Sequence, residues 1–175
     1  MATRQSYEAS CFKLQPDYLE PGSIPPLPDH VPQYDDEEPL GVNFFRVMLD
    51  GDDLSGLSLP RTFFCRSEFT NVSFHNTDLS ESNLCWNDFI GTNLSSALLV
   101  RCDLRASLFS NTSFNSADLS GADLRHSSFD GCDFSDARMS GAVLTMAQGA
   151  VLSLSDQQRS QIAWTDNDGP EPGGG

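Results

Sequence analysis

The sequence is poor in basic residues. It holds 25 acidic residues against only ten basic ones, and Lys13 is its single lysine, so its net charge is −15 and its pI is near 4.2. Proteins that bind nucleic acid or anionic membranes need Lys and Arg to displace counterions from phosphate groups. The charge of this acidic protein therefore argues against a nucleic-acid or membrane partner and leaves protein partners open.

Long apolar runs are also missing. No segment approaches the length that a transmembrane helix needs. Residues 1–13 lack the apolar centre of a signal peptide. We therefore expect a cytoplasmic protein.

Residues typical of catalytic and metal sites are few and scattered. The cysteines are odd in number and contain no close-spaced pair of the zinc type; they are Cys11, Cys65, Cys85, Cys102 and Cys132. The histidines His30, His75 and His126 are equally dispersed. The many carboxylates have no predicted pocket that would shift their pKa values. We expect no catalysis, no cofactor and no metal.

What the chain has instead is an unbroken five-residue repeat. From Phe44 onward, every fifth residue is large and apolar. The series is Phe44, Leu49, Leu54, Leu59, Phe64, Phe69, Phe74, Leu79, Leu84, Phe89, Leu94, Leu99, Leu104, Phe109, Phe114, Leu119, Leu124, Phe129, Phe134, Met139 and Leu144. A period of five fits neither a helix nor a flat strand. It predicts a solenoid whose chain turns a corner once per repeat.

A second series, two residues before each large one, is mostly small and is also predicted to point inward. Cys102 and Cys132 occupy this position, where a free thiol acts as a small apolar group. Asn87 is the internal exception, and its amide must find hydrogen bonds to backbone or to a stacked neighbour. Cys65 and Cys85 lie twenty residues apart, so in a four-sided coil they would stack on adjacent turns. We expect free thiols there, because a reducing cytosol opposes a disulfide.

The segments Ala117–Gly121 and Ala122–His126 resemble the A-(D/N)-L-x-x motif of the pentapeptide-repeat family. The resemblance covers roughly 105 residues. It implies an all-β fold, a right-handed quadrilateral parallel β-helix with four repeats per turn, closed by a short C-terminal capping helix. Residues twenty apart agree with this turn, since Phe69, Phe89, Phe109 and Phe129 form one column. The repeats would make roughly five coils of parallel strands.

The ends of the chain differ from the repeats and divide it into four parts. Residues 1–41 form an acidic, proline-rich tail that either covers the first coil or serves as a linker or ligand. Residues 42–149 form the β-helix. Residues 150–165 form the cap helix, which begins at Ser155 and continues through Arg159 toward Trp164. Residues 166–175 are expected to be disordered.

Function is expected at the outward positions, because the interior is filled. Trp86, Ile90 and Leu108 are predicted to form an exposed apolar corner, a composition typical of binding hot spots. Arg66, Arg105 and Arg125 are predicted to point outward beside it. The competing interpretation is that the N-terminal tail packs against this corner.

We expect a non-catalytic protein-interaction module that binds and shields or neutralises a bacterial protein, in an immunity or scaffold role. The alternative comes from the resemblance: some family members mimic B-form DNA, bind gyrase and protect it from quinolones. Asp78, Glu81 and Asp118 would be the acids of such a DNA mimic. The resemblance also implies a possible homodimer through the C-terminal segment.

Overall fold

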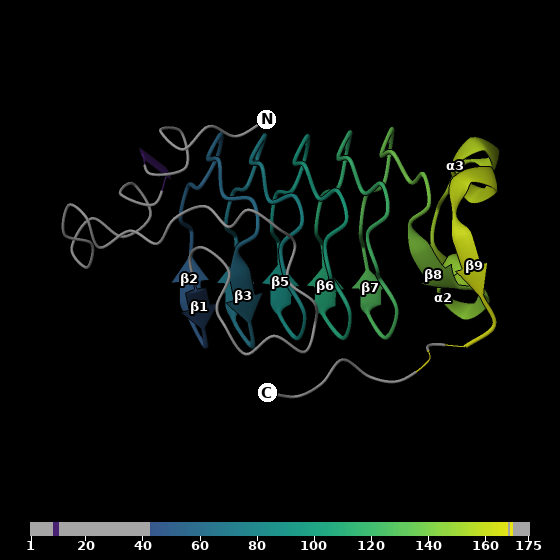
Figure 1. Ribbon diagram of the computed structural model, residues 1–175, viewed down its shortest axis with the longest axis horizontal. Coiled ribbons are helices and arrows are strands. Elements are labelled where there is room, and N and C mark those ends of the chain that lie inside the picture. The colour runs from purple at the N-terminus through teal and green to yellow at the C-terminus, as the bar shows by residue number, and fades with distance from the viewer. Residues whose placement is uncertain (1–8, 11–42, 168, 170–175) are drawn as a thin grey trace.

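The computed structural model describes residues 9–10, 43–167 and 169, which form a parallel β-solenoid (Figure 1). The predictions for the N-terminal tail therefore lie outside the described residues, apart from Ala9 and Ser10. The prediction of disorder after residue 169 lies outside them as well.

The strands are three residues long and stack in parallel. The described strands are β1 (Asn43–Phe45), β2 (Met48–Asp50), β3 (Phe63–Cys65), β4 (Glu68–Thr70), β5 (Asp88–Ile90), β6 (Leu108–Ser110), β7 (Ser128–Asp130), β8 (Val143–Thr145) and β9 (Ala163–Thr165). Every pair between them, and every isolated bridge between the other faces, joins residues twenty apart in the sequence. This register confirms four repeats per turn.

Each repeat turns at a left-handed backbone position. Every fifth residue from Arg46 to Gly141 has a positive φ. Most of these corner residues are not glycine, although the left-handed region is unfavourable for residues with a Cβ atom. The corner geometry is therefore imposed by the stack of coils, which fixes the backbone on both sides of each corner.

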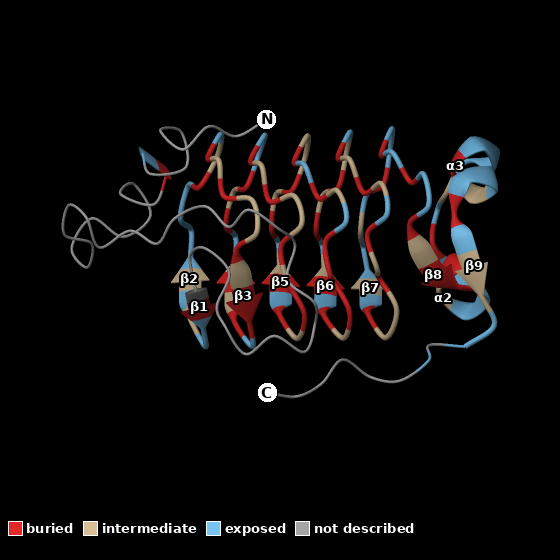
Figure 2. Ribbon diagram, in the orientation of Figure 1, coloured by how far each residue is buried: buried red, intermediate tan, exposed pale blue. Residues whose placement is uncertain are grey.

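The large apolar series fills the interior (Figure 2). The predicted phenylalanine column is present, with Phe69 and Phe89 ring centroids 5.0 Å apart and Phe89 and Phe109 centroids 4.9 Å apart. Rings in consecutive coils lie nearly parallel, whereas neighbouring rings within a coil meet edge to face, as Phe109 and Phe114 do. Both arrangements suit the aromatic quadrupole.

The small inward positions at one corner form a polar ladder. Ser107 N donates to Ser127 Oγ, Asn87 N donates to Ser107 Oγ, and Ser67 N donates to Asn87 Oδ1. Asn87 also donates from Nδ2 to the carbonyl oxygens of Phe64 at 2.8 Å and Leu84 at 2.9 Å. The predicted need of Asn87 for backbone and neighbour hydrogen bonds is confirmed.

The C-terminal segment corrects the prediction of one cap helix. It contains two short helices, α2 (Met146–Val151) and α3 (Asp156–Gln161), followed by β9. Ser155 is the N-cap of α3 as predicted, but Trp164 lies in β9 and not in a helix. Because β9 pairs with β8 at the usual offset of twenty, this segment adds a turn to the roughly five that were expected.

Two glutamines connect these helices to the last coils. Gln148 and Gln158 close the capping boxes that begin at Thr145 and Ser155. The Gln158 Nε2 atom donates to the carbonyls of Phe134 and Ala137, and Gln148 Nε2 donates in the same way to Leu124 and Ser127. Carbonyls that would otherwise face the open end of the solenoid are thus satisfied.

Candidate functional site

A groove of about 400 Å³ lies at the corner between the β3 face and the β4–β5 face. We call it the Trp86 groove. It is lined by Arg46, Val47, Met48, Arg66, Ser67, Glu68, Trp86 and Asp88. These residues come from three consecutive coils, because the twenty-residue offset stacks Arg46, Arg66 and Trp86 at the corner, and Met48, Glu68 and Asp88 on the adjacent strands.

Trp86 stands at a left-handed corner with φ of 60°, an unusual conformation for so large a residue. The guanidinium carbon of Arg66 lies 5.6 Å from the centroid of the Trp86 ring. The indole Nε1 is buried, and no described residue accepts a hydrogen bond from it. Trp86 is therefore half-buried and held beneath a cation.

The strand side of the groove combines acidic and apolar side chains. Glu68 and Asp88 are paired in register, and the pKa of Asp88 is raised by its partial burial and by the charge of Glu68. Met48 at the end of this column is 76% exposed. The groove thus places an exposed thioether beside two carboxylates and two exposed arginines, Arg46 and Arg66.

The structure brings together only part of the predicted apolar corner. Leu108 is 41% exposed and pairs in register with Asp88, next to the groove rather than in its lining. Ile90 is half-buried between Thr70 and Ser110 and is also outside the lining. Sequence reasoning missed Arg46 and Met48, although the twenty-residue register places them directly below Arg66 and Glu68.

Arg105 and Arg125 differ from the prediction of outward cations. Arg105 is buried and donates to Asp103 from Nε at 2.8 Å and from Nη2 at 2.9 Å. Arg125 makes the same two-pronged contact with Asp123, with Nη2 2.6 Å from Oδ2. Each arginine is neutralised by the aspartate two residues before it, which the five-residue period could not show. Of the three predicted arginines, only Arg66 presents its side chain in the groove.

Comparison with known proteins agrees with this geometry. Residues 62–139 match the family model of the pentapeptide repeat region. The chain carries a pentapeptide repeat region. It is similar to a solved pentapeptide repeat protein from the Arabidopsis thaliana thylakoid lumen, with 28% identity, a TM-score of 0.50, and coverage of 65% of this chain and 72% of that one.

Two further solved structures resemble the pentapeptide repeat region. Rfr23 from the cyanobacterium Cyanothece 51142 is 16% identical with a TM-score of 0.56, over 58% of this chain and 82% of that chain; this likeness shows the fold alone. QnrB1, a plasmid-mediated fluoroquinolone resistance protein, is 16% identical over 71% of this chain and 82% of its own, but its TM-score of 0.37 is too low to support an argument. No curated protein matches the chain.

The acids considered for DNA mimicry are largely compensated within the pentapeptide repeat region. Glu81 is bound by Arg61 from the preceding coil and by Arg101 from the following one. Burial raises the pKa of the Glu81 carboxyl, but these two arginines outweigh burial and hold its pKa below the usual value. Asp118 contacts Arg138, and between Asp78 and Asp118 the same column carries Leu98, which is 43% exposed.

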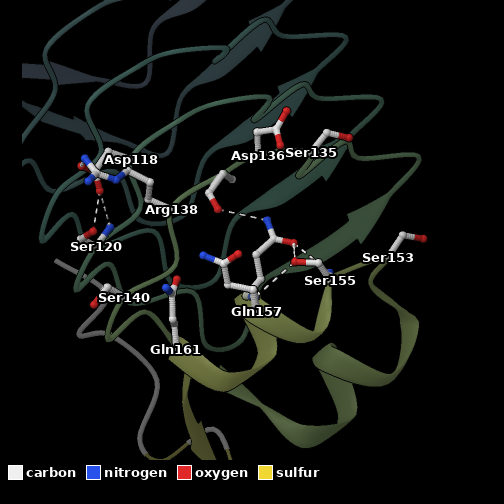
Figure 3. A pocket seen from close by; sticks show the side chains of 12 residues that line it. Asp118, Ser120, Ser135, Asp136, Arg138, Ser140, Ser153, Ser155, Gln157 and Gln161 are labelled. Atoms are coloured by element: carbon white, nitrogen blue, oxygen red, sulfur yellow. Dashed lines mark hydrogen bonds and ion pairs between the residues drawn. The ribbon is translucent and has the colours of Figure 1, made fainter.

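A second hollow, of about 900 Å³, separates the last repeats from α3 (Figure 3). Its lining is polar: Asp118, Ser120, Ser135, Asp136, Ala137, Arg138, Ser140, Ser153, Ser155, Gln157, Gln158 and Gln161. Asp118 accepts hydrogen bonds from the backbone N and the Oγ of Ser120. Gln158, which also lines this hollow, already makes the capping interactions described above.

The described residues contain neither a cluster of metal-binding side chains nor a membrane-spanning helix. Among the described residues, no three His, Cys, Asp or Glu side chains are grouped closely enough to hold a metal ion. No helix in the described part of the chain is long and apolar enough to cross a membrane.

Proposed function

We propose that the pentapeptide repeat region is a non-catalytic protein-binding module that shields or neutralises a protein partner at the Trp86 groove. The observation that carries this proposal is the Arg66–Trp86 stack, in which the guanidinium of Arg66 covers a half-buried indole ring. The buried indole nitrogen of Trp86 has no acceptor among the described residues. Trp and Arg are also the side chains most enriched among binding hot spots.

The chemistry of the groove indicates what the partner presents. Met48 offers an adaptable apolar surface, and Arg46 and Arg66 offer guanidinium groups that bind carboxylates with two parallel hydrogen bonds. Glu68 and Asp88 line the strand side of the groove. We therefore expect a contacting segment that carries an apolar side chain next to an acidic one, with basic residues flanking it.

Quantitative affinity capture from the source cells tests the proposal. Trp86→Ala and Arg66→Ala should each reduce recovery of the specific partner at least about tenfold, the effect of losing a hot-spot side chain. Leu98→Ala is the control, because it removes an exposed apolar side chain from a face that does not line the Trp86 groove. Circular dichroism melting curves verify that the variants stay folded. Equal partner recovery by all three variants would refute the Trp86 groove as the binding surface.

The alternative, a DNA mimic that binds gyrase, has less support from the residues predicted for it. A DNA mimic needs a nearly continuous negative face, whereas Glu81 is paired with two arginines and Leu98 interrupts the Asp78–Asp118 column. A gyrase supercoiling assay distinguishes the two proposals. If the alternative is right, the chain should inhibit supercoiling, and Asp78→Asn with Asp118→Asn should weaken inhibition, as should added salt.

A further inference from the structure

Cys65 and Cys85 occupy the same position on consecutive coils and meet inside the described structure. Their Sγ atoms are 3.5 Å apart. Both are buried, with 7% of Cys65 and 4% of Cys85 exposed, and both are free thiols. The other described cysteines are isolated from this pair, since the Cys102 and Cys132 thiols face the carbonyls of Leu79 and Phe109.

The two thiols are not equivalent. The hydrogen bond from Cys85 lowers the pKa of Cys65, and the positive charge of the adjacent Arg66 lowers it further against the opposing effect of burial. The same hydrogen bond raises the pKa of Cys85, and burial adds to this rise. Of the two thiols, Cys65, which lies beside Arg66, is therefore the one favoured to lose its proton. Burial instead raises the pKa of Cys102 to about 12.

We propose that Cys65 and Cys85 are a reversible oxidation site that links the two coils when the protein meets a peroxide. The Cys65 thiolate attacks one oxygen of hydrogen peroxide and becomes a sulfenic acid, while hydroxide leaves. The Cys85 sulfur then displaces the sulfenic oxygen as water, using its own proton, and the disulfide forms. The two sulfurs lose two electrons in total, and the peroxide gains them.

The spacing of the coils permits this bond. Parallel strands lie about 4.8 Å apart, which falls within the range of Cα separations found across disulfides. Side chains in register point the same way, so their Cβ atoms start farther apart than the roughly 3.8 Å that is usual for a disulfide. A bond formed under that constraint is readily reduced, which suits a reversible modification rather than a permanent staple. This inference does not depend on the proposed partner.

Trypsin separates the cysteines cleanly, so a peptide map of the intact chain tests the proposal. Cleavage after lysine and arginine places Cys11 in residues 5–13, Cys65 in residues 62–66, Cys85 in residues 67–101, Cys102 in residues 102–105 and Cys132 in residues 126–138. After treatment with hydrogen peroxide and alkylation, we expect peptides 62–66 and 67–101 to be joined, about 2 Da lighter than their sum, and separated by dithiothreitol. Cys102 should remain an alkylatable thiol.

Two variants sharpen the test. In Cys85→Ser, Cys65 should stop at the sulfenic acid and be trapped by dimedone, whereas Cys102→Ser should leave the cross-link unchanged. The proposal is overturned if the folded wild-type protein yields 62–66 and 67–101 as separate peptides after oxidation. It is equally overturned if either peptide is joined instead to residues 5–13, 102–105 or 126–138, or to a second chain. Because the decisive map uses the wild-type protein, a variant that fails to fold would not leave the question open.

Discussion

Asn87 shows how one side chain can replace a regular element of the repeat. At the positions one coil below and one coil above, serine oxygens accept the backbone N–H from the preceding coil, as Ser67 and Ser107 do. Asn87 supplies the same acceptor through Oδ1 and adds two donated hydrogen bonds to Phe64 and Leu84. The larger amide is tolerated at a buried position because each of its polar atoms has a partner.

We expect Asn87→Ala to destabilise the solenoid by about 2–4 kcal/mol, since it removes the partner of the buried Ser67 N–H and of the Phe64 carbonyl. The Leu84 carbonyl also loses the bond from Asn87 but keeps the one from Ser107 Oγ. Asn87→Ser should be less harmful, because a serine at this position extends the ladder formed by Ser107 and Ser127. Urea denaturation of both variants measures the difference. Equal losses would mean that lost volume, and not lost hydrogen bonds, dominates the effect.

Glu81 gives a pH dependence whose sign is fixed by its two arginines. Its pKa is lower in the folded chain than in the unfolded chain, so its ion pairs stabilise the fold above the unfolded pKa of about 4.3. This stabilisation is lost as the pH falls through the lower, folded pKa. In melting experiments from pH 7 to pH 3, wild type should therefore lose more stability than Glu81→Gln. Parallel melting curves would contradict the ion-pair assignment.

At the residue scale, the sequence predicts whether a side chain points inward or outward better than it predicts which side chains form ion pairs. The five-residue period correctly placed Leu84, Leu104 and Cys102 inside, because inward direction follows from position in the repeat alone. It could not show that Arg105 folds back onto Asp103, because side-chain rotamers and ion pairs are set by local geometry. The period likewise predicted that Trp86 and Arg66 point outward, but it did not show that they form a groove with Arg46 and Met48.

At the scale of elements, the C-terminal segment continues the solenoid after the repeat has disappeared from the sequence. The large residue expected at position 149 is replaced by glycine, and the ring of Trp164, from the strand β9, lies where a Gly149 side chain would project. Leu154 and Trp164 still fall on the five-residue series, but Gly149 and Arg159 interrupt it, so the sequence does not show a continuous repeat here. The N-cap at Ser155 was predictable because capping depends on neighbouring residues only.

Gly149→Ala provides a test in which two effects have opposite signs. Helix propensity alone predicts that alanine in α2 stabilises the chain by up to about 1 kcal/mol. The added Cβ atom, however, would overlap the Trp164 ring, and overpacking commonly destabilises by about 1–3 kcal/mol. We expect a net loss of thermal stability. Adding Trp164→Leu should make Gly149→Ala less harmful, and additive effects in this double-mutant cycle would contradict the contact.

At the scale of the molecule, the solenoid has two ends with different chemistry. The C-terminal end is closed by α2, α3 and their capping glutamines. At the other end, Leu54, Leu57 and Leu59 are buried although they belong to the first described coil. Ser10 lies against this end, where its Oγ accepts a hydrogen bond of 2.7 Å from the Ser58 backbone. The solenoid could be predicted because each coil repeats the previous one. The segments that cover its two ends could not be predicted, because they do not follow the repeat.

Deleting residues 1–40 should therefore expose the first coil. The Ser58 N–H would lose its partner, and an open row of strand edges would be free to pair with a second chain. We expect the truncated protein to sediment as larger species than the full chain at equal concentration and to bind more of a hydrophobic dye. Deletion of residues 170–175 is the control and should change neither. If the protein lacking residues 1–40 sediments like the full chain and binds no more dye, the N-terminal segment does not protect this end, and the burial of Leu54, Leu57 and Leu59 must come from the coil itself.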